Sequence, residues 1–362
     1  MSKFVPSPSA SISEFDSRCV EAAELYVKAN ASLTDRSAWA IRIFSTLNLF
    51  LWHLDAFKKD KDPVPMFVEV FNKASALLES ASSSGVIGGH FQPYSLSDEP
   101  EDYEDMVSDL FSDLWLDMTD DIYFEESYQY TMERFEKSGF NPEEIFGGKI
   151  VLDAGCGSGK FSVVLARFGA EKVIGIDIGK RGLEFARKQA AKVPCGKNID
   201  FRYGSSFDIP FDDGSLDVVW SNGVIHHTLG YEKCVEEFFR VLKPGGTLFL
   251  HVNGCFGLYE LLLDKLREAT ADIPWAFFRQ YLKFLNVNSG RLYWVMDCLY
   301  APYEWKSKEQ VEDLMKRHGF TDIKQLLRGV DSDPIEMVTS GLPYASVKYG
   351  DAQLKFLAQK PL

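Results

Sequence analysis

The residues with the clearest chemical meaning lie at Val151–Gly159, which reads VLDAGCGSG. A short apolar run ends there at Asp153, and three glycines follow at alternate positions: Gly155, Gly157 and Gly159. Glycine is favoured where a backbone takes a positive φ or approaches a ligand closely. Because a helix-forming segment begins at Lys160, the sequence predicts a ligand-binding strand, glycine turn and helix.

A second acid supports this interpretation. Asp177 ends the next predicted strand, Lys172–Ile178, and stands 24 residues after Asp153. An acid about 20 residues beyond a glycine turn is placed to accept hydrogen bonds from ribose hydroxyls. The structural alternative is that Asp177 caps the following helix. Dinucleotide-binding and nucleoside-binding folds both use such an acid, so Asp177 alone does not choose between them.

The elements that must position these residues alternate between strands and helices. Five strands are predicted, at Val151–Asp153, Lys172–Ile178, Ile199–Tyr203, Asp217–Ser221 and Thr247–Val252. Helices fit between them at Phe161–Phe168, Gly182–Lys192 and Tyr231–Val241. Such alternation indicates a parallel sheet buried on both faces. Two later strands, Asp322–Leu327 and Gln353–Gln359, show no helical pattern between them. The predicted fold is therefore α/β, a doubly wound, mostly parallel seven-stranded sheet with an antiparallel last strand.

Three regions of different character are expected around this core. Residues 1–120 form a helical N-terminal region, a cap or a dimerisation surface, with helices at Ser13–Ala29, Asp35–Phe57 and Val64–Ser80. Residues 121–252 and 304–362 form the core, and residues 253–303 form a helical, aromatic-rich cap insertion. Between residues 98 and 121 there are eleven acids and no Lys or Arg. This run is either the solvated face of an amphipathic helix or an acidic lid that favours a cationic substrate.

Composition excludes several classes of partner. The chain has 362 residues and a formal net charge of −14, which disfavours binding to nucleic acid. No apolar run approaches the roughly 20 residues that span a bilayer, and the N-terminus lacks a secretory signal. The six cysteines form no CxxC pair, which fits neither a metal site nor a disulfide framework. We expect a reduced, cytoplasmic protein without a bound metal or a membrane partner.

Two further segments complete a recognisable series. Asp208–Asp217, which reads DIPFDDGSLD, leads into the fourth strand, and Val241–Gly246, which reads VLKPGG, opens the fifth. Together with the glycine turn, they resemble the class I S-adenosylmethionine-dependent methyltransferases over Val151–Val252. The pair His226–His227 after the fourth strand is similar to that of a branch of the family that acts on small molecules.

The resemblance implies S-adenosylmethionine as the cofactor. The glycine turn would lie under its methionine part, Asp153 would hold the turn or meet the ammonium group, and Asp177 would take the ribose hydroxyls. Ser205 stands where many relatives carry an acid, so the adenine would rely on the backbone near Ser206 and Phe207. The full set of implied cofactor-binding residues is Asp153, Gly155, Cys156, Gly157, Gly159, Asp177, Ile178, Ser206, Phe207, Asn222, Gly223 and Tyr123.

The resemblance also implies where the methyl acceptor binds. The acceptor would attack the sulfonium methyl in line, with His226 as a candidate base, although both histidines could instead only hold their loop. His227, Tyr300 and Tyr303 are candidate substrate-binding residues. Arg291–Trp305 forms either a pocket wall or the packing of the cap. His251 is expected to be a satisfied core histidine, and residues 328–336 a surface loop before a substrate-contacting one.

Competing interpretations make different demands on the sequence. A nicotinamide-dependent oxidoreductase would need the spacing G-x-G-x-x-G, which the alternate glycines do not provide. RNA methylation is disfavoured by the charge and by Ser221–Val224, where an N-P-P-Y-like tetrad would stand. A degenerate relative that binds S-adenosylmethionine and acts through protein contacts is the main alternative. The acceptor atom is left open among O, N, C and S, and the N-terminal helices could pair in a homodimer.

Overall fold

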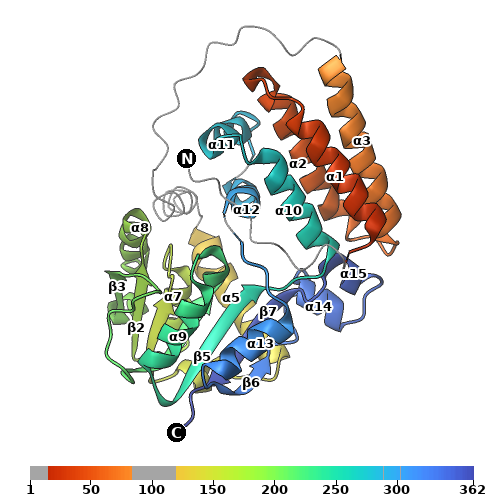
Figure 1. Ribbon diagram of the computed structural model, residues 1–362. Coiled ribbons are helices and arrows are strands. Elements are labelled where there is room, and N and C mark those ends of the chain that lie inside the picture. The colour runs from red at the N-terminus through yellow and green to blue at the C-terminus, as the bar shows by residue number, and fades with distance from the viewer. Residues whose placement is uncertain (1–14, 84–119, 288, 302) are drawn as a thin grey trace. The chain divides into compact units, whose positions relative to one another are not determined.

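The computed structural model describes residues 15–83, 120–287, 289–301 and 303–362, which fall into two compact units (Figure 1). The helical unit contains the described residues up to 83 together with 255–301 and 341–350. The sheet unit contains residues 120–254, 303–340 and 351–362. The predicted acidic segment at 98–121 lies outside the described residues, apart from its last two positions.

The sheet unit is built on seven strands in the order β3-β2-β1-β4-β5-β7-β6. Their bounds are β1 Ile150–Ala154, β2 Lys172–Asp177, β3 Ile199–Tyr203, β4 Leu216–Asn222, β5 Leu242–Asn253, β6 Thr321–Gln325 and β7 Gln353–Gln359. Strands β1 to β5 pair in parallel, and β7 runs antiparallel to both β5 and β6. The predicted fold class is thus confirmed.

Helices cover both faces of this sheet, as its apolar strands require. Alternate residues of β1 enter different cores: Val151 packs on one face and Leu152 on the other. The face of Val151 is covered by α5 (Ser127–Lys137), α6 (Pro142–Phe146), α7 (Lys160–Arg167) and α8 (Lys180–Ala190). The face of Leu152 is covered by α9 (Tyr231–Val241) and α13 (Lys308–Arg317), which lie in front of the sheet in Figure 1.

The strand order fixes where a ligand can bind. The chain runs outward from β1 through β2 to β3 and then crosses to β4 on the other side of β1. The chain therefore leaves β1 and β4 toward opposite sides at the carboxyl edge of the sheet. Doubly wound folds bind their ligands at this switch point.

The expectation of no helix between the last two strands was wrong. α14 (Pro334–Thr339) and α15 (Ala345–Tyr349) lie between β6 and β7, and the segment around α15 belongs to the helical unit. Both helices are shorter than two turns, so neither carries enough apolar periodicity to be recognised. Proline stands at the first position of α14, where its missing N–H costs nothing.

The helical unit joins two regions that are distant in the sequence. Its first helices are α1 (Ser17–Ala31), α2 (Trp39–Ala56) and α3 (Pro63–Ser83), and its later ones are α10 (Leu258–Thr270), α11 (Trp275–Phe284), α12 (Ser289–Tyr300) and α15. Arg42 on α2 is 2% exposed, bonds to the Asn30 side chain at 2.6 Å, and pairs with Asp272 after α10. In the part of the chain that is described, no helix combines the length and the apolar character needed to cross a membrane.

Candidate cofactor and acceptor site

The glycine turn folds tightly over the end of β2. The N–H groups of Gly155 and Cys156 both donate to the Ile176 carbonyl at 2.9 Å. Gly155 has φ +80°, and a Cβ built on it would lie 2.4 Å from Val224 Cγ1, in the segment after β4. The turns after β1 and β4 therefore touch at the switch point, and glycine is required there by the fold itself as well as by a ligand.

Asp177 fastens the same turn from the end of β2. Its Oδ2 accepts from the Gly157 N–H at 2.9 Å, and its Oδ1 accepts from the Gly179 N–H at 2.7 Å. Burial raises the pKa of Asp177, while these backbone N–H groups oppose that rise. Each carboxylate oxygen still has lone-pair capacity for a further donor, so the residue is able to take ribose hydroxyls as well. Both sequence interpretations, helix cap and ribose ligand, are compatible with this geometry.

Asp153 lies beneath the turn. It is 2% exposed, and its Oδ2 accepts from the Ser162 hydroxyl at 2.6 Å. Burial raises the pKa of Asp153 to about 7, against the lowering effect of Ser162. Cys156 is likewise buried, and its Sγ would lie 3.0 Å from a Cβ on Gly175, so the thiol packs on β2. Of the two options predicted for Asp153, this contact corresponds to holding the turn.

Tyr123 supports the turn from the N-terminal side. It is fully buried, and its hydroxyl donates to the Ser158 carbonyl at 2.7 Å. Its ring lies against Phe124 and Phe185, with ring centroids 4.7 and 6.1 Å away. The segment before β1 therefore braces the outer side of the glycine turn.

The segment predicted to flank an adenine follows β3. Ser206 and Phe207 are partly exposed there, as is Ile178 after β2. The Phe207 N–H donates to the Ser205 hydroxyl at 3.2 Å. The Phe207 ring packs beside Gly230, where an added Cβ would come within 2.6 Å of it. The serine in place of the common acid is thus used to shape the turn.

The two histidines after β4 lie in a ring cluster. His226 and His227 have ring centroids 4.1 Å apart, and Tyr303 lies 5.2 Å from the first and 4.4 Å from the second. The backbone N–H of Glu304 donates to the His226 carbonyl at 2.7 Å. Three of the predicted acceptor-side residues are therefore brought together, although His226 is only 3% exposed.

Tyr300 belongs to the helical unit, whereas the ring cluster belongs to the sheet unit. Its hydroxyl donates to the Ile273 carbonyl at 3.2 Å, and its ring lies 5.2 Å from that of Phe278. These contacts hold α12 against α11 and the turn before it.

The sequence analysis missed a polar cluster at the ends of β4, β5 and β7. Strand pairing sets Asn222 beside His251 and His251 beside Lys355. His251 Nδ1 lies 2.8 Å from Asn222 Oδ1, but Nε2 is buried without a hydrogen-bond partner among the described residues. The expectation of a satisfied core histidine was therefore wrong for one of its two ring nitrogens, Nε2. The sequence could not show this, because the neighbours of His251 depend on the strand register.

A buried ion pair backs this cluster. Arg134 on α5 donates two hydrogen bonds of 2.7 Å to Asp333, which lies 3.8 Å from Lys355 Nζ. Asp333 is 4% exposed and Glu336 is 6% exposed. Residues 328–336 are thus not wholly the surface loop that was expected: Asp333 and Glu336 are paired inside the sheet unit, whereas Asp331 is exposed. A signal for this was present in the excess of acids over bases within that short polar segment.

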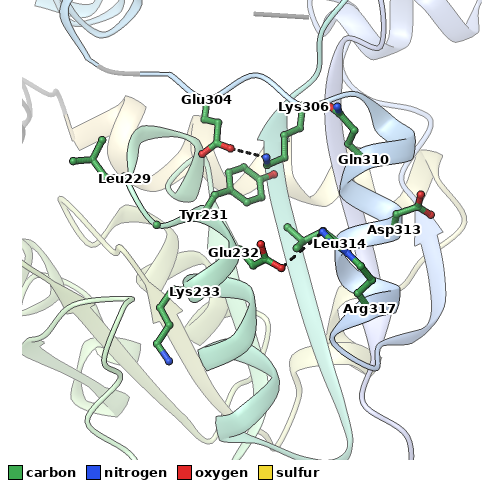
Figure 2. A pocket seen from close by; sticks show the side chains of 11 residues that line it. Leu229, Tyr231, Glu232, Lys233, Glu304, Lys306, Gln310, Asp313, Leu314 and Arg317 are labelled. Carbon is green, nitrogen blue, oxygen red and sulfur yellow. Dashed lines mark hydrogen bonds and ion pairs between the residues drawn. The ribbon is translucent and has the colours of Figure 1, made fainter. Parts of the chain in front are cut away.

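A separate pocket of about 620 Å³ lies at the start of α9 and α13. Figure 2 shows Tyr231 at its centre, with Lys306 Nζ 4.9 Å from the ring centroid and 2.5 Å from Glu304. Its lining contains none of the residues predicted to bind the cofactor. Glu304, which lines this pocket, follows Tyr303 in the chain and donates its backbone N–H to the His226 carbonyl.

Comparison with known proteins gives a consistent result. The model of a methyltransferase domain matches residues 152–250. A demethylmenaquinone methyltransferase of Lactococcus lactis is 32% identical over 214 residues, which cover 56% of this chain and 78% of that protein. A second one, from Symbiobacterium thermophilum, is 28% identical over 50% of this chain and 73% of its own length. The 27-O-demethylrifamycin SV methyltransferase of Amycolatopsis mediterranei is 30% identical, over 45% of this chain and 62% of its own length.

The fold is that of a doubly wound α/β protein, and the glycine turn held by Asp177 lies at its switch point. The chain belongs to the class I S-adenosylmethionine-dependent methyltransferases. The resemblance stated from the sequence is thereby confirmed, with S-adenosylmethionine as the cofactor.

Proposed function

We propose that the protein transfers a methyl group from S-adenosylmethionine to a small-molecule acceptor. The observation that carries the proposal is the glycine turn tied to Asp177 at the switch point. Its backbone is held by Asp177, by Tyr123 and by the contact of Gly155 with Val224, so it is formed before any ligand arrives. The relatives compared above, whose names refer to small-molecule substrates, support the acceptor class.

The residues present fit this cofactor. Asp177 would hold the ribose, the glycine turn the methionine part, and Asn222 with Gly223 its far side. Ile178, Ser206 and Phe207, all partly exposed, would flank the adenine. When bound, S-adenosylmethionine supplies an activated methyl group on a positively charged sulfonium. The chain then has mainly to hold an acceptor in line, and such orientation is able to lower a barrier by several kcal/mol.

On the acceptor side we propose His226 as a base, with His227 and Tyr303 contacting the substrate. The ring cluster supports this, because it places three aromatic groups directly after β4. We further propose that Tyr300 contacts the substrate. Small-molecule sites are mostly apolar and lined by rings, as this set would provide.

The first test is calorimetric titration of the full chain with S-adenosylmethionine and S-adenosylhomocysteine. Micromolar binding is expected, with no signal from NADH. Asp177→Ala removes two charge-assisted hydrogen bonds at the turn, so the affinity should fall about 100-fold or more. The matched control is Asp200→Ala on β3, which should leave binding unchanged. Within the described ranges its carboxylate pairs with exposed Arg202.

Two results would count against the proposal. Absence of binding to either adenosyl compound would remove the catalytic function, and equal loss in both variants would remove the assigned role of Asp177. Binding without turnover on any acceptor would favour a protein that acts through contacts instead. With an acceptor in hand, His226→Ala should lower kcat by about 10²-fold or more if it acts as a base.

A further inference from the structure

Three polar side chains form a row across neighbouring strands of the sheet unit. Asn222 on β4 is in register with His251 on β5, and His251 is in register with Lys355 on β7. Side chains directly opposite in such pairs have Cβ atoms about 4.5–5.5 Å apart. Two residues earlier on the same face, the rings of Trp220 and Phe249 stack at 3.9 Å. The apolar core therefore ends at a polar row, on the edge where doubly wound folds bind ligands.

The hydrogen bonding leaves one atom of this row available. Asn222 Oδ1 only accepts, so the 2.8 Å bond requires the proton of His251 to be on Nδ1. The lone pair of His251 then lies on Nε2, which is buried and has no partner among the described residues. A buried acceptor left unpaired costs about 1–3 kcal/mol. A hydrogen-bond donor on a bound ligand would remove that cost. His251 as a whole residue is only partly buried.

Charges around the row favour one kind of donor. Lys355 is 3% exposed, and its Nζ lies 2.9 Å from Gln353 Oε1 and 3.8 Å from Asp333 Oδ2. Asp333 also takes both hydrogen bonds of Arg134, so two basic side chains share one carboxylate. A cationic acceptor would be repelled here. A hydroxyl that becomes anionic as it loses its proton would be stabilised.

The protonation states support this view. Burial lowers the pKa of Lys355 to about 7, with Asp333 opposing that effect, so the amine is able to gain its full charge when an anion approaches. Burial and the charge of Lys355 lower the pKa of His251 well below its ordinary value. The imidazole therefore stays neutral and keeps the Nε2 lone pair.

We propose that Asn222, His251 and Lys355 form a subsite for the hydroxyl of an aromatic or enolic methyl acceptor. His251 Nε2 accepts the hydroxyl hydrogen bond, and Lys355 stabilises the oxygen as its proton leaves. The hydroxyl oxygen bonds to the methyl carbon as the carbon–sulfur bond breaks, the electron pair stays on sulfur, and the proton passes to His251 Nε2. For an oxygen acceptor His251 is then the base, and His226 has its alternative role of holding the loop after β4. This inference rests on the proposed methyltransferase function and deepens it, because it names oxygen as the acceptor atom.

The test compares two probes that differ in one hydrogen-bond donor. 2-Naphthol and 2-methoxynaphthalene are titrated calorimetrically into the full chain saturated with S-adenosylhomocysteine. The native protein should bind 2-naphthol about tenfold or more tightly than the ether. His251→Phe should abolish that preference, and His251→Gln, which keeps an acceptor at the distal position, should retain part of it. His318→Gln, at a partly buried histidine of the sheet unit whose Nε2 lies 3.4 Å from Glu232, is the control and should change nothing.

The remaining outcomes decide against the subsite. Equal affinity for the two probes, no binding of either, or an unchanged preference in His251→Phe would each overturn it. Binding of S-adenosylhomocysteine is recorded in every titration, so failure of the cofactor site is seen separately from failure of the subsite.

A spectroscopic measurement covers the case in which His251→Phe does not fold. In protein labelled with ¹⁵N-histidine, the His251 ring signals are identified by their loss in His251→Gln. The expected result is a tautomer with the proton on Nδ1 and none on Nε2. The ¹⁵N chemical shift of Nε2 should change when 2-naphthol is added. An Nε2–H tautomer or an imidazolium ion would overturn the proposal.

Discussion

Two acids at the ends of adjacent strands have different surroundings at the residue scale. Asp177 faces two backbone N–H donors, which oppose the rise in its pKa that burial causes. Asp153 has one hydroxyl donor and is almost fully buried, so its charged form is disfavoured. The first is suited to holding a polar ligand, whereas the second is suited to holding the turn.

This difference predicts how stability depends on pH. The folded-state pKa of Asp153 is raised from 3.8 to about 7, so between these values the folded protein binds the proton more tightly than the unfolded chain. Its contribution to the free energy of unfolding is therefore present below about pH 4 and lost as the pH rises to 7. Asp153→Asn should remove this loss and become more stable than the native protein at neutral pH, by the order of a few kcal/mol.

Urea unfolding of both proteins at pH 5, 6, 7 and 8 measures the effect. The difference between variant and native protein should grow from pH 5 to 7 and level off above that. Asp200→Asn, an exposed position, is the control. A constant difference across the series would contradict the assigned environment of Asp153.

Residues of the cofactor site could be predicted because their signal is local. Asp153, the glycines and Asp177 lie within 25 consecutive residues, and their spacing alone encodes a strand, turn and strand. Asn222, His251 and Lys355 come from three distant segments and meet only through the register of β4, β5 and β7. No spacing in the sequence predicts that register, so the polar row could not be found before the structure.

At the scale of elements, the contact between the turns after β1 and β4 is decisive. Gly155 has a positive φ and would place a Cβ 2.4 Å from Val224 Cγ1 and 2.7 Å from Val224 Cγ2. Gly155→Ala should therefore destabilise the protein by about 2–4 kcal/mol, from backbone strain and overpacking together. It should also weaken binding of S-adenosylhomocysteine.

The double variant Gly155→Ala/Val224→Ala separates these two causes. Removing the two methyl groups of Val224 relieves the overpacking and leaves the strain, so part of the lost stability should return. Thermal unfolding of the four proteins gives the interaction energy. Strict additivity of the two single changes would show that the turns do not touch.

Long elements could be predicted and short ones could not. The seven strands and the helices α7, α8 and α9 were all expected near their observed bounds, since each carries clear periodicity. α6, α14 and α15 are five or six residues long and were not. Association of residues 341–350 with the helical unit depends on packing, which no local pattern records.

At the scale of the whole molecule, the helical unit presents exposed apolar side chains. Phe44 and Leu51 on α2 are 50% and 42% exposed, Leu25 on α1 is 48% exposed, and Leu77 on α3 is 42% exposed. Phe44 and Leu51 are seven residues apart and share one face of their helix. Exposed apolar groups of this kind often mark a protein interface. We propose that this unit pairs with a second copy.

Sedimentation of the full chain at micromolar concentration tests the pairing. The native protein should sediment as a dimer, and Phe44→Glu/Leu51→Glu should sediment as a monomer while keeping its affinity for S-adenosylhomocysteine. Leu327→Glu, at a position 46% exposed in the sheet unit, is the control and should stay dimeric. A native monomer would end the proposal.

The position of β7 has a consequence for how the chain is made. β7 is later in the sequence than β6 but lies between β5 and β6, and it is the only strand in the described sheet with which β6 pairs. While the ribosome is still translating codons beyond 340, a nascent sheet can therefore have no partner for the open edge of β5. Such an edge is a template for pairing with another chain. Slow translation of that stretch should lengthen the period in which chaperones must shield it.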